Sequence, residues 1–467
     1  MSEAANAKEY VAGLIQRAKA AQKVIEYFTQ EQVDELAAAV AWSCVKDGPA
    51  QEIAKMAVEE SKMGYYDAKY GKLMVKVKGA LRDMKGGKSV GVIERDDKLG
   101  IIKIAKPVGV IGCIIPCTNP EATPVVKGIW CVKTRNAAIF APHPRTKKTN
   151  TYVVNTMRAA LKKYGVPEDL FVAIEEPTME ITQELMKQCD LILATGGGGL
   201  VKEAHSSGTP AYGVGQGNAT VIVDETADLK EAANKLMRSK TFDYATSCSA
   251  ENSMVIQEGI YDEFIGYVKA EGGYVVNADE KAKLLKAVWP DGSHLNQGII
   301  AQPLQTIAGI AGINVPADKK FLVVEETGIG PAFPFSGEKL SMIVTFFKYK
   351  NFPDAVDMIN KITQYHGRGH SCGIHTSKDE RVIEYGLKTK TSRIMVNQPQ
   401  CLANSGAWTN SMPMSMTLGC GIGKEWGSNI TSENVTWKHL LNVTWISYPI
   451  ASTQPTDEEL FGDVMKK

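Results

Sequence analysis

Short runs rich in valine and isoleucine alternate with helical stretches between residues 108 and 225, and this rhythm limits the fold more than any other feature of the chain. The runs are VGVIGCII, AAIFAP, LILAT and TVIVD, with helical patterns at 121–134, 147–164 and 199–206 between them. Strand, helix and strand in this order predict a parallel sheet with helices on both faces. We therefore expect a first α/β domain over residues 1–241.

A second α/β pattern occupies residues 242–425. Its expected strands are SMVIQ, SMIVTFF, SCGIHT and SRIMVN, with a helix at 353–364. No long linker separates the two patterns, so a short crossover near residue 241 should join them. In the tail, 426–467, a helix start at Ser432 and apolar spacing through Trp445 predict a helix that packs on the core or on a partner subunit.

Before the first strand, residues 8–90 have the apolar spacing of helices, and Thr29 with Gln32 predicts a capping box at the start of one of them. Two β-rich runs at 90–106 then flank a charged turn, which predicts a hairpin that projects from the body. Arms of this kind often pair between subunits.

Charge and composition exclude several classes of protein. Lysine plus arginine number 53 and aspartate plus glutamate 52, which leaves a net charge of +1 and no field that would attract nucleic acid or an anionic membrane. No apolar run approaches the roughly 18 residues of a membrane span, and the start MSEAANAKEY lacks the pattern of an export signal. The nine scattered cysteines fit a reducing compartment, so we expect a cytoplasmic protein.

Two loops favour a nucleotide ligand when they are taken together. The glycine turn 195–199 follows the strand LILA and precedes a helix, where backbone N–H groups can approach a phosphate. The basic segment APHPR, 141–145, follows the strand AAIF, with Lys147 and Lys148 beyond it. Each loop alone is equally compatible with a tight turn or a solvated connection.

Cys248 is the candidate nucleophile, because it lies in the polar stretch 244–249 just before the strand SMVIQ. A reactive thiol must be reachable and needs hydrogen-bond donors nearby. Most of the other cysteines should be buried small hydrophobes. His366 and His370 are four residues apart, but glycines between them disfavour a helix and no third ligand is evident, so we expect no metal site.

The order of these motifs resembles the aldehyde dehydrogenase superfamily, and within it the CoA-acylating branch. The motifs are PCTNP at 116–120, APHPR, ATGGGG, GVGQGN at 213–218, Cys248 and EKLS at 338–341. The resemblance implies an α/β fold with a Rossmann-type dinucleotide-binding domain, a catalytic cysteine domain and a hairpin arm through which a homodimer or higher homo-oligomer forms. It implies an aldehyde and CoA as substrates, with NAD or NADP as the cofactor.

The resemblance also implies roles for individual residues. Cys248 would attack the aldehyde, Asn119 would hold the resulting oxyanion, and His370 matches a histidine near the acyl-transfer site. The residues implied for cofactor binding are Thr118, His143, Arg145, Thr195, Gly196, Gly197, Gly198 and Glu338. Gly213 stands where hydrolytic relatives carry the glutamate that activates water, so the acyl group should go to CoA. Met342 stands where the family commonly has a proline after the EKLS motif, and this departure affects only the expected local turn after Glu338.

The substrate is predicted from the polar surroundings of the cysteine. Hydroxyl groups flank it at Tyr244, Thr246, Ser247 and Ser249, and Arg368 supplies positive charge. Such a site suits a small anion, so we expect sulfoacetaldehyde, with succinate semialdehyde or acetaldehyde as alternatives; acylating dehydrogenases of the first two aldehydes are similar to this chain. The polar groups could instead only bond the backbone, and the rival from another class is a non-catalytic nucleotide-binding protein.

Overall fold

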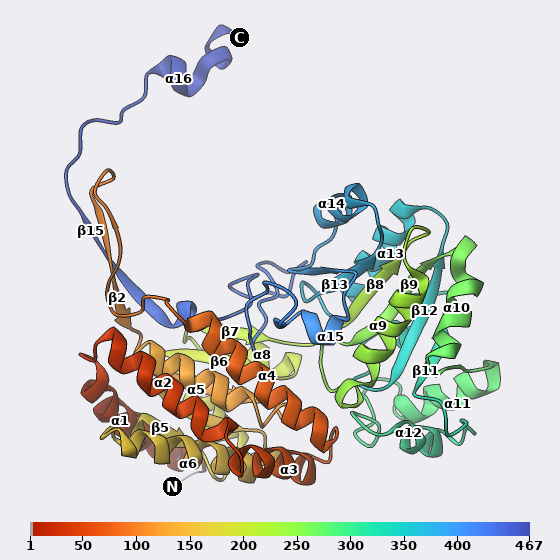
Figure 1. Cartoon of the computed structure of the whole chain (residues 1–467), viewed down its shortest axis with the longest axis horizontal. Helices are drawn as coiled ribbons and strands as arrows, with labels where there is room; N and C mark the ends of the chain where they lie inside the picture. Colours follow the sequence, from red (N-terminus) through yellow and green to blue (C-terminus); the bar gives the residue numbers. More distant parts are fainter. Residues whose placement is uncertain (1–2) are drawn as a thin grey trace.

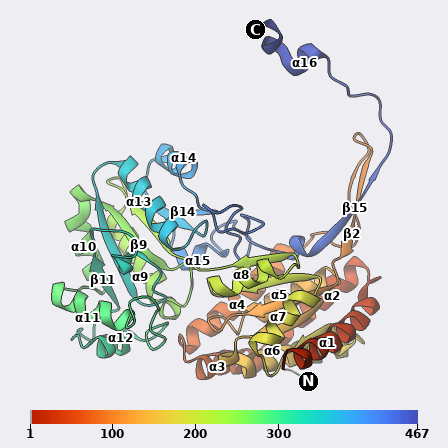
Figure 2. The ribbon, with the colours of Figure 1, turned by 180° about the vertical axis from the view of Figure 1, so that it is seen from behind.

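The computed structural model describes residues 3–467 and contains two α/β bodies side by side, with an arm that projects from the first (Figures 1 and 2). The α/β fold predicted from the sequence is confirmed. Across residues 3–467, no helix is long and apolar enough to cross a membrane.

The first body is built on a five-stranded parallel sheet with the order β5-β4-β3-β6-β7. These strands are β3 (Val110–Ile115), β4 (Ala137–Pro142), β5 (Phe171–Ala173), β6 (Leu191–Thr195) and β7 (Ala211–Val214). The helices between them are α5 (Thr123–Lys133), α6 (Lys147–Lys163), α7 (Met179–Gln188) and α8 (Gly198–Ser206). Helices α5, α6 and α8 lie close to their predicted ranges, because local apolar patterns set these elements, whereas α7, β5 and β7 were not predicted.

Four N-terminal helices cover this body: α1 (Glu3–Ile25), α2 (Gln30–Val45), α3 (Pro49–Ser61) and α4 (Tyr66–Met84). The predicted capping box is present, since the Thr29 hydroxyl accepts from the Gln32 N–H at 3.3 Å and the Gln32 side chain accepts from the Thr29 N–H at 2.8 Å. One continuous apolar core joins these helices to the first sheet, with Trp130 and Phe140 among its fully buried side chains.

The second body is built on a seven-stranded parallel sheet with the order β10-β11-β12-β9-β8-β13-β14. The strands are β8 (Ala219–Val223), β9 (Glu251–Gln257), β10 (Gly273–Val275), β11 (Phe321–Glu325), β12 (Ile343–Tyr349), β13 (Cys372–His375) and β14 (Ile394–Val396). Its helices are α9 (Leu229–Thr241), α10 (Tyr261–Ala270), α11 (Ala278–Val288), α12 (Leu304–Ala311), α13 (Phe352–Tyr365), α14 (Asp379–Lys388) and α15 (Gln400–Ala403).

Strand β8 corrects the expected boundary between the two α/β units. The sequence assigned the run TVIVD to the first sheet and put the boundary near residue 241. Val221 instead pairs with Met254 of β9 and with Gly373 of β13, so β8 and α9 belong to the second sheet. The chain therefore passes from one sheet to the other at residues 215–218, between β7 and β8.

The arm is a three-stranded sheet with the order β1-β2-β15. Strands β1 (Gly91–Asp96) and β2 (Ile101–Pro107) form the hairpin expected at 90–106. The helix predicted over 432–445 is wrong, because β15 (Leu441–Ser447) pairs antiparallel with β2, Val443 opposite Ala105. Side chains along 441–447 alternate with the period of a strand, and the backbone N–H and C=O groups of this segment pair with those of β2.

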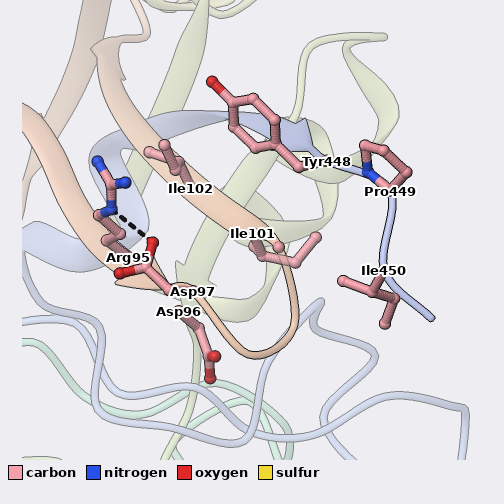
Figure 3. Close-up of a pocket in the computed structure, with 9 residues that line it drawn as sticks. Arg95, Asp96, Asp97, Ile101, Ile102, Tyr448, Pro449 and Ile450 are labelled. Atoms are coloured by element: carbon pink, nitrogen blue, oxygen red, sulfur yellow. Dashed lines mark hydrogen bonds and ion pairs between the residues drawn. The ribbon is translucent and has the colours of Figure 1, made fainter.

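After β15 the chain runs past the hairpin turn and then away from both bodies (Figures 1 and 2). A pocket lies between the turn and this segment, where Tyr448, Pro449 and Ile450 face Ile101 and Ile102 (Figure 3). The chain ends in the short helix α16 (Asp457–Phe461) and a 3₁₀ turn at Gly462–Lys466.

Candidate active site

The loops that carry the predicted motifs come from the facing edges of the two sheets. Asn119, His143 and the glycine turn follow β3, β4 and β6, so they lie at the carboxyl ends of strands in the first sheet. Cys248 and His370 precede β9 and β13, so they lie at the amino ends of strands in the second. Ligands of open parallel sheets bind beyond the carboxyl ends of the strands, and here that edge meets the second body.

Cys248 and His370 are in direct contact. The Cys248 sulfur lies 3.2 Å from His370 Nε2, and His370 Nδ1 lies 2.8 Å from the Ser371 hydroxyl. His370 is fully buried, and the guanidinium of Arg393 donates to its carbonyl oxygen at 2.7 Å. The structure thus brings together two residues that are separated by more than a hundred positions in the chain.

Burial keeps both groups of this pair neutral. It raises the pKa of the Cys248 thiol to about 12, and the Glu338 carboxylate adds to the rise. It lowers the pKa of His370 to about 3, with a further contribution from the positive charge of Arg393. A neutral thiol and a neutral imidazole therefore face each other across this contact.

Asn119 is held by groups on both sides of its carboxamide. Lys72 of α4 donates to Oδ1 at 2.6 Å, and Nδ2 donates to the Thr118 hydroxyl at 3.1 Å. The backbone carbonyl of Thr118 accepts from the buried amino group of Lys69 at 2.6 Å. Thr118 and Asn119, both predicted as site residues, thus share one hydrogen-bonded loop after β3.

The segment before Cys248 has an unusual backbone. Asp243, Tyr244 and Ala245 all have positive φ, between 51° and 59°, which is the left-handed region that costs a residue with a Cβ about 1–2 kcal/mol. The Asp243 carboxylate holds this turn, since it lies 2.5 Å from the Lys72 amino group and accepts from the Thr246 hydroxyl at 2.5 Å.

Sequence reasoning missed Lys69, Lys72 and Asp243. The lysines are buried on α4, and the two positive charges share the carboxylate of Asp243. A signal was present, because the lysines at 69, 72 and 76 recur with the spacing of a buried helix face.

Gly217 brings the chain between β7 and β8 against the cysteine. A Cβ at this position would lie 1.9 Å from the Cys248 carbonyl oxygen and 3.0 Å from its Cβ. The Gly217 N–H donates to Glu338 Oε1 at 3.0 Å, and burial raises the pKa of Glu338 to about 8. Glu338 thus lies beside the loop that carries Cys248, shortly before β12.

The glycine turn after β6 suits a dinucleotide. Thr195 is anchored through its hydroxyl, which lies 3.0 Å from the Thr417 hydroxyl, and Gly197 caps α8. Cβ atoms at Gly197, Gly198 and Gly199 would meet no atom within 4 Å, whereas one at Gly196 would meet Leu200 at 2.6 Å. The space in front of the helix start is open, and its N–H groups favour a phosphate there.

The basic loop after β4 is partly neutralised by the chain's own carboxylates. His143 Nδ1 accepts from the Arg145 N–H at 3.1 Å, and the Arg145 guanidinium donates to the Ser61 carbonyl at 2.9 Å. Lys147 pairs with Glu176. Glu60 of α3 accepts from the N–H of Lys148 at 2.8 Å and from the N–H of Thr149 at 2.7 Å, so a carboxylate occupies the N-terminus of α6.

The predicted substrate residues differ in where they point. Tyr244 is partly exposed, with its ring 4.9 Å from the ring of Tyr65, whereas Thr246 and Ser249 are buried. Thr246 bonds Asp243, and the Ser249 hydroxyl lies 2.9 Å from that of the partly exposed Ser247. The Arg368 guanidinium is exposed and donates to the carbonyls of Gln364 and Lys424, which ties two loops together.

Comparison of the chain with known proteins identifies one family. A model described as the aldehyde dehydrogenase family matches residues 3–277. A sulfoacetaldehyde dehydrogenase of Acholeplasma sp is 47% identical over 97% of this chain and 94% of its own length. A sulfoacetaldehyde dehydrogenase (acylating) of Bilophila wadsworthia is 47% identical over 96% of this chain and 97% of its own length.

The fold has close relatives among solved structures. The crystal structure of an acetylating aldehyde dehydrogenase from Geobacillus thermoglucosidasius superposes with a TM-score of 0.92. The two chains are 38% identical, and the superposition covers 97% of this chain and all of the other. The likeness includes both α/β bodies.

Proposed function

Because the chain belongs to the aldehyde dehydrogenase family, in its CoA-acylating branch, we propose that it converts sulfoacetaldehyde, CoA and NAD+ to sulfoacetyl-CoA, NADH and a proton through a thioester on Cys248. The observation that carries the proposal is the 3.2 Å contact between the Cys248 sulfur and His370 Nε2. A non-catalytic nucleotide-binding protein has no need of a histidine in contact with the sulfur of a cysteine at this place.

The first proposed step is addition of Cys248 to the aldehyde. The sulfur bonds to the carbonyl carbon, the thiol proton moves to His370 Nε2, and the carbonyl oxygen takes the negative charge. The Ser371 hydroxyl can accept from Nδ1–H, and the proposed step uses the tautomer in which it does so and Nε2 is the acceptor. A thiol whose pKa is raised to about 12 by burial is neutral at pH 7, so its proton must be taken up by a neighbouring base before the nucleophilic thiolate can form.

Asn119 is proposed to stabilise that oxyanion. Its Nδ2 gives one hydrogen to the Thr118 hydroxyl, and no side chain or backbone oxygen within residues 3–467 takes the other. A preorganised amide donor of this kind is worth about 10²–10³ in rate. The backbone N–H of Cys248 is the expected second donor.

The cofactor is proposed to lie along the carboxyl edge of the first sheet. A nicotinamide bound there would accept the hydride that leaves the carbon attached to Cys248. The open N-terminus of α8 supports binding of the pyrophosphate at Gly196, Gly197 and Gly198, with Thr195 anchoring the turn. Glu338 has a buried carboxyl group with an oxygen that could accept from a ribose hydroxyl in addition to the bond from the Gly217 N–H.

We further propose that NAD+ is preferred and NADP+ tolerated. His143 and Arg145 are expected near the adenosine ribose, and the carboxylate of Glu60 lies at the adjacent start of α6. Hydroxyl groups can donate to that carboxylate, whereas a 2′-phosphate would be repelled by it. Arg145 and Lys148 leave some positive charge for the phosphate.

For the substrate, the support comes from the two relatives at 47% identity and from the hydroxyl groups beside Cys248. Tyr244 and Ser247 are the partly exposed ones and are proposed to donate to the sulfonate; Thr246 and Ser249 are proposed to support the loop from inside. Arg368 could add charge only if it left one of its two carbonyl partners. Succinate semialdehyde and acetaldehyde are the second and third candidates.

The experiment is a comparison of kcat/KM for the three aldehydes at saturating CoA, with Tyr244→Phe as the variant. Sulfoacetaldehyde should give the highest value, and the variant should lose more activity toward it than toward acetaldehyde, because only the sulfonate needs the phenol hydroxyl. If acetaldehyde exceeds both anions, the anionic pocket is wrong.

The arm and the cysteines support two accompanying proposals. The exposed side chains of Val443 and Trp445 on β15 favour a homodimer in which the arm meets a second copy. All nine cysteines are free, which suits the reducing cytoplasm. Sedimentation of the protein, with and without Trp445→Lys, tests the first of these.

A further inference from the structure

Two lysines of α4 carry buried charges in the centre of the molecule. Lys69 and Lys72 lie one helical turn apart, and their side chains are 0% and 7% exposed. A buried ammonium is costly unless it is paired and hydrogen-bonded. Both amino groups contact Asp243 Oδ2, at 2.9 and 2.5 Å, and Glu121 adds a second carboxylate 3.5 Å from Lys72. The two positive and two negative charges balance.

Lys72 differs from Lys69 because it also reaches Asn119. Its amino group donates to Asn119 Oδ1 at 2.6 Å. An ammonium has donors only, so this contact requires the carboxamide oxygen to face Lys72 and its NH₂ group to face the other way. A hydrogen bond to the oxygen also polarises the amide and makes its N–H groups stronger donors.

Lys72 thereby joins the two halves of the site. Asn119 belongs to the loop after β3, and Asp243 begins the left-handed turn that leads to Cys248. The approach is close enough to require a glycine on the other side, since a Cβ at Gly64 would lie 1.8 Å from Asp243 Oδ1. One amino group thus fixes the oxyanion donor relative to the loop that carries the nucleophile.

We propose that Lys72 is a positioning residue for the reaction, which holds the carboxamide of Asn119 so that its free N–H points at the oxyanion formed on addition to Cys248. This inference rests on the proposed function, because it needs an oxyanion at that place. Lys72 acts through Asn119, and it touches neither the substrate nor the reacting sulfur.

The test is a double-mutant cycle between Lys72→Met and Asn119→Ala, with Lys69→Met as the matched comparison. Two reactions are followed: NADH formation from the aldehyde, and the burst of nitrophenolate when 4-nitrophenyl acetate acylates Cys248. Lys72→Met should slow both about 10- to 100-fold, since the donor remains but is misdirected. In the Asn119→Ala background the same change should add almost nothing.

Lys69→Met removes a cation from the same aspartate and a donor from the Thr118 carbonyl, but it leaves the hydrogen bond to the Asn119 carboxamide in place. Its effect should therefore be smaller, and it should multiply with that of Asn119→Ala. Alkylation of Cys248 by iodoacetamide forms no oxyanion, so its rate should be the same in Lys72→Met and in the wild type. If circular dichroism shows that Lys72→Met does not fold, Lys72→Gln replaces it, because its shorter amide can still donate to Asp243.

Equal losses in the two lysine variants, or a loss at Lys72 that multiplies with Asn119→Ala, would overturn the positioning role. Failure of the proposed function has a different signature. The wild type itself would then give neither the burst nor NADH, whereas an active wild type with an additive cycle refutes only the role of Lys72.

Discussion

Substitution of Gly217 by alanine should displace Cys248, and the close contact between the two residues sets the size of the displacement. A Cβ at this position would lie 1.9 Å from the Cys248 carbonyl oxygen, and Cβ atoms essentially never approach another atom within 3.0 Å. The loop that carries Cys248 and the loop that carries Gly217 must therefore move apart by at least 1.1 Å, the difference between these two distances. A misplacement of about 1 Å costs on the order of 100-fold in rate, so kcat/KM should fall by about that factor.

The assay combines steady-state NADH formation with titration of Cys248 by iodoacetamide and a thermal melt. Gly266→Ala on α10 is the control, because a Cβ there would meet nothing within 4 Å and alanine favours a helix by about 1 kcal/mol. The control should keep its activity and gain stability. If Gly217→Ala retains kcat/KM within about threefold, the contact with Cys248 does not position the nucleophile and the reasoning fails.

Cys248→Ala should abolish turnover while NAD+ binding, followed by calorimetry, stays within about threefold, because the glycine turn is untouched; near-normal NADH formation would require another nucleophile. Glu60→Gln should raise the NADP+ to NAD+ ratio of kcat/KM about tenfold, since removal of one like charge is worth about 1.4 kcal/mol; an unchanged ratio would exclude Glu60 as the determinant. Burial lowers the pKa of His375 from 6.5 to about 4, so the stability it contributes is present above pH 6.5 and is lost as the pH falls. As the pH falls from 6.5 to 5, the free energy of unfolding measured in urea should decrease by about 1.6 kcal/mol more in the wild type than in His375→Gln, and equal decreases would contradict the assignment.

The positions of the motif loops could be predicted from the sequence because each loop follows or precedes a strand with a strong local pattern. Asn119 after β3 and Cys248 before β9 are examples. Membership of a sheet could not be predicted in the same way. The run TVIVD has the same local pattern in either sheet, and only its pairing with Met254 and Gly373, which are distant in the chain, assigns β8 to the second.

The buried charges of Lys69, Lys72 and Asp243 were not predicted, for a related reason. Lysine on a helix is usually solvated, and the partner that explains its burial, Asp243, lies 171 residues away. The strand β15 was missed because apolar residues at 435 and 440 fit a helix, although Leu441, Val443 and Trp445 already had the period of two that identifies a strand.

Packing at two glycines explains why the proposed thioester should wait for CoA. A Cβ at Gly213 would lie 2.7 Å from Val201 and 3.3 Å from His205, so a side chain at this position would be directed into α8. A Cβ at Gly217 would meet Cys248 itself. Neither position has room for the carboxylate that activates water in hydrolytic relatives. Water that lacks this carboxylate is a poor nucleophile, whereas a thiol that loses its proton is a strong one. The chain therefore disfavours hydrolysis through the packing of its backbone as well as through the residue that it lacks.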